Sequence, residues 1–134
     1  MNFIAGIALL VMPTEEDAFW LLTSIVEEHN SGKYASTMVT LQVDTLVLDD
    51  LLSEKLPELK EHMNKYNIDT IIVATKWFMC LFIGHLPTET LFRLWDKLFL
   101  YGPQVIFRAA FHILSIAKDN LLQAKDPSKF SHYF

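Results

Sequence analysis

Residues 74–111 are the most informative stretch of the chain, and they read ATKWFMCLFIGHLPTETLFRLWDKLFLYGPQVIFRAAF. An apolar run ends at Gly84, and Pro87 opens an amphipathic segment that carries Arg-Leu-Trp-Asp at positions 93–96. Gly102 and the proline after it interrupt the pattern before a third apolar run begins. The stretch therefore predicts three successive helices separated by two turns, with the rest of the chain packed around them.

Helical periodicity continues on both sides of this stretch, and no strand pattern of any length competes with it. Thr14 is placed to cap a helix, with Asp17 three residues later, while Pro57 suits a first helical turn and Asp69 can cap the helix that follows. The expected fold class is therefore all-α with about six to seven helices. The expected helices cover residues 1–11, 14–28, 41–55, 57–66, 70–83, 87–101 and 105–122.

The apolar spacing also predicts which side chains form the core. The helix over 70–83 is apolar around most of its circumference and is expected at the centre. In the helix over 14–28, the 3.6-residue spacing predicts that Phe19, Leu22 and Val26, or their neighbours, are buried. Carboxylates such as Asp49 are expected on solvated helix faces.

Composition restricts the classes of function. The chain has 134 residues, of which 51% are hydrophobic and 20% charged, which is typical of a sequence that forms a core and meets another domain. A net charge of −5 with only two arginines argues against binding to nucleic acid or to an anionic lipid surface. Cys80 is the one cysteine, so no internal disulfide is expected and a cytoplasmic location is favoured. Lys76 interrupts the longest apolar run, so no transmembrane segment is expected.

Candidate chemistry is sparse. The five histidines are scattered, so neither a metal site nor a cofactor is expected. Residues 31–33 read Ser-Gly-Lys but lack the earlier glycine and the preceding strand of a phosphate-binding loop. Arg93 and Asp96 flank Trp95 on a mostly apolar helix, which fits either a binding hot spot or a structural brace, and we favour the brace. No catalytic residue is predicted.

Taken together, these motifs resemble the C-terminal half of the TBC domain, which is found in GTPase-activating proteins for Rab-type small GTPases. The first residues, Met-Asn-Phe-Ile-Ala-Gly, are similar to the family's M-N-x-[IL]-x-[AG], and the match is weakest between residues 29 and 38. The residues to which we assign a signature or structural role are Asn2, Trp77, Pro87, Arg93, Trp95, Asp96 and Gly102.

The resemblance also implies which chemistry this chain lacks. In the family, the arginine of I-x-x-D-x-x-R stabilises charge on the transferred phosphoryl group, and the glutamine of Y-x-Q orients the attacking water. Neither motif occurs in this sequence, and the glutamine would fall two residues before Met1. Arg93 and Arg108 lie in helices of the other half and do not match the family's arginine. The chain alone is therefore expected to be inactive.

The resemblance implies that residues 1–126 are the C-terminal lobe of a two-lobed TBC fold and that residues 127–134 are a truncated tail. The implied partners are a Rab-type GTPase and the missing N-terminal lobe, with the protein located at the periphery of endomembranes in vesicle trafficking. Self-association through exposed apolar surface is expected when the chain is on its own. An alternative is a non-catalytic helical module that binds a small GTPase or another protein. An unrelated helical enzyme is a third interpretation, and it would need a convergent polar site.

Overall fold

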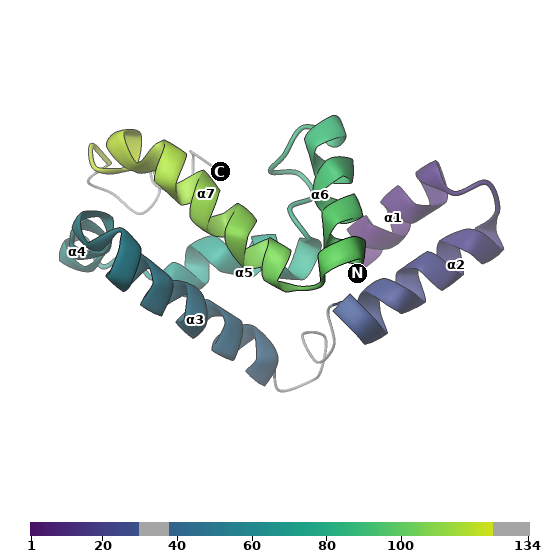
Figure 1. Cartoon of the computed structure of the whole chain (residues 1–134), viewed down its shortest axis with the longest axis horizontal. Helices are drawn as coiled ribbons and strands as arrows, with labels where there is room; N and C mark the ends of the chain where they lie inside the picture. Colours follow the sequence, from purple (N-terminus) through teal and green to yellow (C-terminus); the bar gives the residue numbers. More distant parts are fainter. Residues whose placement is uncertain (30–37, 125–134) are drawn as a thin grey trace.

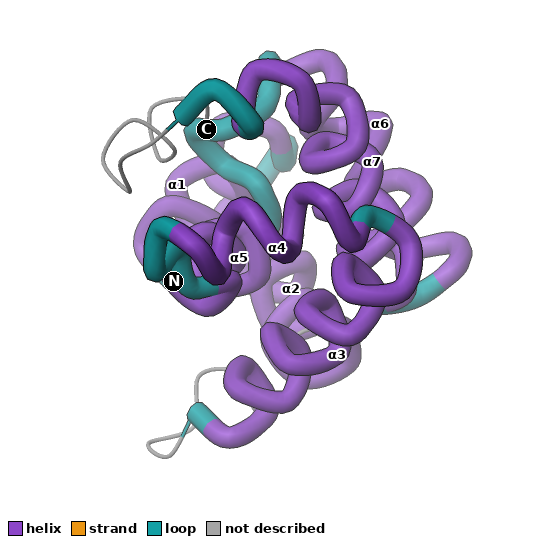
Figure 2. The backbone as a smooth tube through the Cα atoms, turned by 90° about the vertical axis from the view of Figure 1, so that its left-hand side faces the viewer, coloured by secondary structure: helices purple, strands orange, loops and turns teal. Residues whose placement is uncertain are grey.

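The computed structural model describes residues 1–29 and 38–124, and this part of the chain contains helices and loops but no strand (Figures 1 and 2). The prediction of an all-α fold is therefore confirmed. The predicted tail at 127–134 and the Ser-Gly-Lys sequence at 31–33 lie outside the described residues. The helices are α1 (Asn2–Val11), α2 (Glu15–Ser24), the short π-helix η1 (Ile25–His29), α3 (Val39–Lys55), α4 (Pro57–Lys65), α5 (Thr70–Cys80), α6 (Thr88–Tyr101) and α7 (Gln104–Leu121).

The helices form two groups that meet at α6. Helices α1 and α2 pack against each other as a hairpin at one end of the molecule (Figure 1). At the other end, α3 contacts α4, α5 and α7, and α7 also packs against α6. Ile4 of α1 and Ile25 of η1 belong to the same buried cluster as the side chains of the second group. The hairpin is therefore joined to the rest of the molecule by apolar burial.

Three helix starts follow the sequence signals. The Thr14 hydroxyl accepts a hydrogen bond from the Asp17 backbone N–H (3.1 Å) at the start of α2. Pro57 occupies the first turn of α4, where its missing N–H costs nothing. An oxygen of Asp69 accepts from the Ile71 N–H (3.2 Å) at the start of α5. Each side chain satisfies or replaces a backbone donor that has no partner within the helix.

The core is centred on α5 and the turn after it. Trp77, Phe78, Leu81 and Phe82 have no exposed surface, and the rings of Trp77 and Phe82 are stacked with centroids 5.4 Å apart. The expectation that this region lies at the centre of the core is confirmed.

The predicted end of this helix was wrong. Helix α5 stops at Cys80 rather than continuing to residue 83, because Leu81 and Phe82 adopt left-handed backbone conformations with φ of 48° and 65°. A non-glycine residue in this conformation costs roughly 1–2 kcal/mol. Complete burial of a Leu or Phe side chain stabilises by about 1.5–3 kcal/mol, so burial outweighs the strain. Gly84, the predicted terminator, lies in the following turn with φ of 81°.

The buried face of α2 and η1 falls on neighbours of the predicted positions, which the prediction allowed. Phe19 is 59% exposed and lies in edge-to-face contact with Trp20, whereas Ala18 and Ile25 are buried. Positions 18 to 22 are all apolar, so the 3.6-residue period fits several neighbouring faces and cannot decide between them.

Candidate functional site

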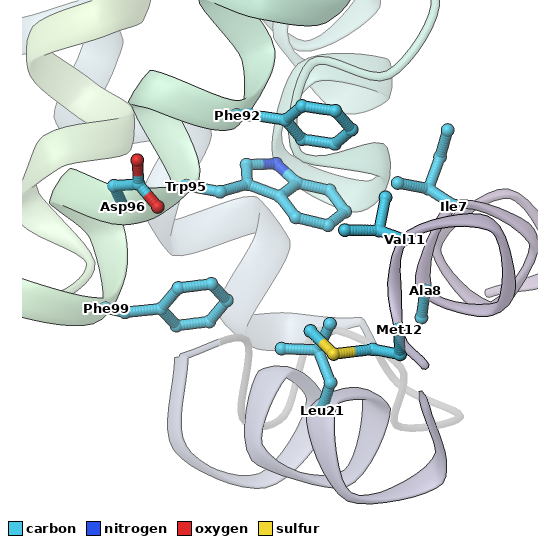
Figure 3. Close-up of a pocket in the computed structure, with 9 residues that line it drawn as sticks. All are labelled: Ile7, Ala8, Val11, Met12, Leu21, Phe92, Trp95, Asp96 and Phe99. Carbon is cyan, nitrogen blue, oxygen red and sulfur yellow. The ribbon is translucent and has the colours of Figure 1, made fainter. Parts of the chain in front are cut away.

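The hairpin and α6 enclose an apolar groove with a cavity volume of about 260 Å³ (Figure 3). One wall comes from α1 and α2, and the other comes from side chains on α6 at positions i, i+3, i+4 and i+7, which share one helix face. The lining residues are Ile7, Ala8, Val11, Met12, Leu21, Phe92, Trp95, Asp96 and Phe99. Aromatic and aliphatic side chains dominate, and Asp96 is the one charged group among them.

Trp95 is the fixed part of this groove. Its indole N–H donates to the Leu81 carbonyl oxygen (3.1 Å), and the side chain is buried. The left-handed turn after α5 therefore positions the indole, because that turn directs the carbonyl towards α6. Phe92 contacts Trp95 edge to face, with ring centroids 6.5 Å apart.

Phe99 forms the other aromatic part of the wall and connects α6 to the end of the hairpin. Its ring lies 5.2 Å from the His29 ring, in edge-to-face geometry. The Glu28 carboxylate lies 4.0 Å from His29 Nε2, which places an exposed acidic group beside the groove.

Arg93 and Asp96 do not form a convergent polar site. Arg93 Nη2 pairs with Glu89 Oε1 (2.6 Å) on the same helix, and both side chains are more than 70% exposed. An exposed pair of this kind adds little to stability. Asp96 is exposed at the rim of the groove.

The other signature residues lie apart from the groove. The Asn2 side-chain oxygen accepts from the Phe3 N–H (3.0 Å) at the start of α1, and Trp77 is deep in the core. Pro87 immediately precedes α6, and Gly102 ends it with φ of 83°. Trp77 and Trp95 belong to the same buried cluster, whereas Asn2, Pro87 and Gly102 lie at helix ends. The signature role of the set stays a prediction.

A polar cluster joins α3, α4 and α5 at the edge of a second hollow, of about 300 Å³. Asp49 accepts from Lys60 Nζ (2.5 Å) and from the Thr70 hydroxyl, and its side chain is only 29% exposed. The expectation that Asp49 is simply solvated was therefore wrong. Partial burial raises the pKa of Asp49, but the hydrogen bonds from Lys60 and Thr70 and the charge of Lys60 outweigh it, so the net pKa is lowered. The cluster holds three helices together and leaves no activated base.

Other kinds of site were not found within residues 1–29 and 38–124. This part of the chain contains no group of three or more His, Cys, Asp or Glu side chains placed to hold a metal ion. None of the described helices is both long and apolar enough to cross a bilayer. The groove is thus the feature best shaped for recognition.

The sequence did not reveal the groove, because its two walls are more than 70 residues apart along the chain. One signal was available. Phe92 and Phe99 extend the apolar stripe of α6 on one side, so the stripe is wider than a single helix contact requires; its other members are Leu91, Leu94, Trp95 and Leu98. What the stripe faces depends on long-range packing, which periodicity does not specify.

Comparison with known proteins gives a consistent result. The family model described as Rab-GTPase-TBC domain matches residues 1–122. TBC1 domain family member 2A of Mus musculus is 40% identical over 134 residues, covering 99% of this chain and 14% of that protein. Growth hormone-regulated TBC protein 1 of Xenopus tropicalis is 36% identical over 126 residues, covering 94% of this chain and 37% of that protein.

A solved structure extends the comparison from the sequence to the fold. The crystal structure of the Chlamydomonas flagellar RabGAP TBC domain aligns with a TM-score of 0.84 and 38% identity, over 99% of this chain and 44% of that chain. This chain therefore spans less than half the length of these relatives. The all-α fold matches part of a TBC domain, and the chain belongs to the Rab-GTPase-TBC domain family.

Proposed function

We propose that this chain is the C-terminal part of a Rab GTPase-activating domain, which contributes to binding a Rab-type GTPase in vesicle trafficking but supplies neither catalytic finger. One observation carries the proposal. The family match extends over residues 1–122, yet the sequence contains neither I-x-x-D-x-x-R nor Y-x-Q. An arginine finger contributes about 10³–10⁵ in rate, so a chain without one is expected to be inactive alone.

The two arginines of the chain are poor substitutes for a finger. Arg93 is already paired with Glu89 on its own helix, and Arg108 lies on α7, where it borders a hollow lined by Phe107 and Phe111. A finger must instead reach into the phosphate site of a bound GTPase.

The proposed extent of the domain, residues 1–126, is supported by contacts beyond the end of α7. Ala124 is buried, and its carbonyl oxygen accepts from His62 Nε2 (2.7 Å) on α4. Lys118 of α7 also pairs with Glu58 of α4. These contacts support a lobe that includes residue 124. Residues 127–134 are proposed to be a tail outside it.

Single-turnover GTP hydrolysis by a panel of Rab GTPases tests the proposal. We expect the purified chain to leave each intrinsic rate unchanged to within about twofold, because no finger is supplied. Acceleration of any Rab by about tenfold or more would contradict this expectation.

A non-catalytic interaction module is the second candidate, and the apolar groove beside α6 favours it. The two candidates differ when the finger-bearing part of a TBC domain is supplied. If the chain is half of a catalytic domain, adding that part should produce GTPase-activating activity. If the chain is a self-sufficient module, it should bind its partner equally well with or without that part and show no such activity.

A further inference from the structure

Helix α1 is apolar on every side. It contains no charged residue, and Asn2 is its only residue with a polar side chain. A helix that is apolar all round is typically buried on all sides within a larger protein. In the described structure, however, only Ile4 and Ala8 of this helix are buried. The sequence of α1 therefore fits a more enclosed position than this chain alone provides.

One face of α1 is covered by the rest of the chain and the other is not. The side of the helix that carries Ile7 and Val11 lines the groove opposite α6 (Figure 3). The other side, which we call the outer face of α1, is centred on Gly6, because residues three and four positions apart share a helix face. Its members are Phe3, Gly6, Leu9 and Leu10, and its three large side chains are 61%, 57% and 83% exposed.

The glycine at the centre of this face has no explanation within the described part of the chain. Glycine inside a helix lowers stability relative to alanine. A Cβ added at Gly6 would meet no described atom within 4 Å, so packing inside this chain does not require the position to be small. A segment whose backbone crosses α1 closely would require it, since the distance between packed helices depends on the side chains at the contact.

The remainder of a TBC domain is the natural occupant of this face. The solved TBC domain that matches 99% of this chain is matched over only 44% of its own length. More than half of that chain therefore has no counterpart among these 134 residues. Exposure of α1 in this chain is thus no sign that α1 is exposed in a longer domain.

Other occupants fit the outer face less well. Residues 1–29 hold five acidic residues and no Lys or Arg, and α1 lacks the polar face of a helix that lies on a lipid surface. A contact between two copies would bring two such acidic segments together, which disfavours it. We expect that contact only where the better occupant is missing, as in the self-association expected of the chain on its own.

We propose that the outer face of α1 is the surface on which the remainder of the TBC domain packs, with a segment of that remainder crossing α1 at Gly6. The inference rests on the proposed function, because it takes this chain to be part of a larger GTPase-activating domain. In that domain the outer face is interior and contacts no separate partner.

Thiol labelling of an introduced cysteine tests whether the face is covered. Leu10→Cys is made in the full 134-residue chain and in a fusion that carries the finger-bearing half of a related TBC domain ahead of residue 1. We expect a maleimide to label it at least about tenfold more slowly in the fusion, because burial hinders access to the thiol. Ile116→Cys, at a position of α7 that is 72% exposed, is the matched control and should react equally fast in both proteins.

The labelling is done at a concentration at which sedimentation shows a monomer, so that a second copy does not protect the cysteine. Equal labelling of Leu10→Cys in the two proteins overturns the proposal. So does protection in the fusion that appears only when its concentration is raised, or only when a GTP-loaded Rab or lipid vesicles are added. These results would assign the face to a second copy, to the GTPase or to a membrane.

A larger residue at Gly6 tests the close crossing. Gly6→Leu should raise the Tm of the monomeric chain by about 2–4 °C, because leucine is the better helix former and the position is open. In the fusion the same change should lower the Tm by about 3 °C or more, because the added side chain is forced into a packed contact. Ser115→Leu, at an exposed position of α7, should shift both proteins alike. A rise of equal size in chain and fusion contradicts the crossing at Gly6.

GTP hydrolysis by a Rab is measured on the same fusion to keep this inference separate from the proposed function. Protection of Leu10→Cys without acceleration would contradict the proposed function and support the packing surface. Acceleration without protection would overturn the packing surface and leave the proposed function intact.

Discussion

Asp49 combines a hydrogen bond with an ion pair, and both connect α3 to other helices. It accepts from Lys60 of α4 and Thr70 of α5, so replacing it by Asn removes a charged acceptor shared by three helices. We expect Asp49→Asn to lower the free energy of unfolding by about 1 kcal/mol at pH 7, the low end for such bonds because part of the carboxylate meets solvent. Urea denaturation measures the change, and Asp50→Asn, one exposed position further along α3, should leave it nearly unaltered.

The pH dependence of this effect has a definite sign. Because the folded-state pKa of Asp49 is lowered from 3.8, its contribution is fully present above the unfolded-state pKa and is lost as pH falls through the folded-state pKa. The difference in unfolding free energy between wild type and Asp49→Asn should therefore shrink below about pH 4. A difference that stays constant from pH 7 to acid would contradict the role of the carboxylate charge.

Trp95 and Arg93 belong to the same motif, but we expect only Trp95 to contribute substantially to stability. Replacing Trp95 by Phe removes the donor to the buried Leu81 carbonyl oxygen and should cost about 1–3 kcal/mol. Arg93→Ala removes an exposed pair and should change stability by no more than about 0.5 kcal/mol. Thermal unfolding of the two variants distinguishes them, and equal losses would show that Arg93 braces the lobe after all.

At the scale of the element, Gly102 decides how α6 ends. Its φ of 83° and ψ of −175° fall in a region almost restricted to glycine, and a Cβ there would lie 3.2 Å from Gln104 Oε1. We expect Gly102→Ala to destabilise by about 1–3 kcal/mol, as measured by chemical denaturation. Gly6 is the matched control, since it lies inside α1 with open space around it, and Gly6→Ala should stabilise by up to about 1 kcal/mol.

The helices could be predicted from the sequence because their signals are local. Thr14, Pro57 and Asp69 mark helix starts through contacts within a few residues, and the structure places helices at all three. The end of α5 could not be predicted, because Leu81 and Phe82 are held in left-handed conformations by burial. That burial comes from residues distant in the chain, which no local pattern contains.

At the scale of the whole molecule, the candidate site was the least predictable feature. Arg93, Trp95 and Asp96 were recognisable as a motif, but only the fold shows that Trp95 and Asp96 line the groove between α6 and α1 while Arg93 is exposed. The depth of Asp49 was missed for the same reason, since its partners lie on two later helices. Family membership, in contrast, followed from motifs that sequence alone displays.

The central proposal is that this chain provides no catalytic finger. The most direct test is therefore to add the finger-bearing half of a TBC domain and measure GTP hydrolysis. Fusing the finger-bearing half of a related TBC domain ahead of residue 1 should produce a protein that accelerates GTP hydrolysis by at least one Rab by about 10³-fold or more. Replacing the arginine of the donor's I-x-x-D-x-x-R by Ala in that fusion should abolish the acceleration. Acceleration by the unfused chain, or by the fusion without its arginine, would contradict the proposal that this chain provides no catalytic finger.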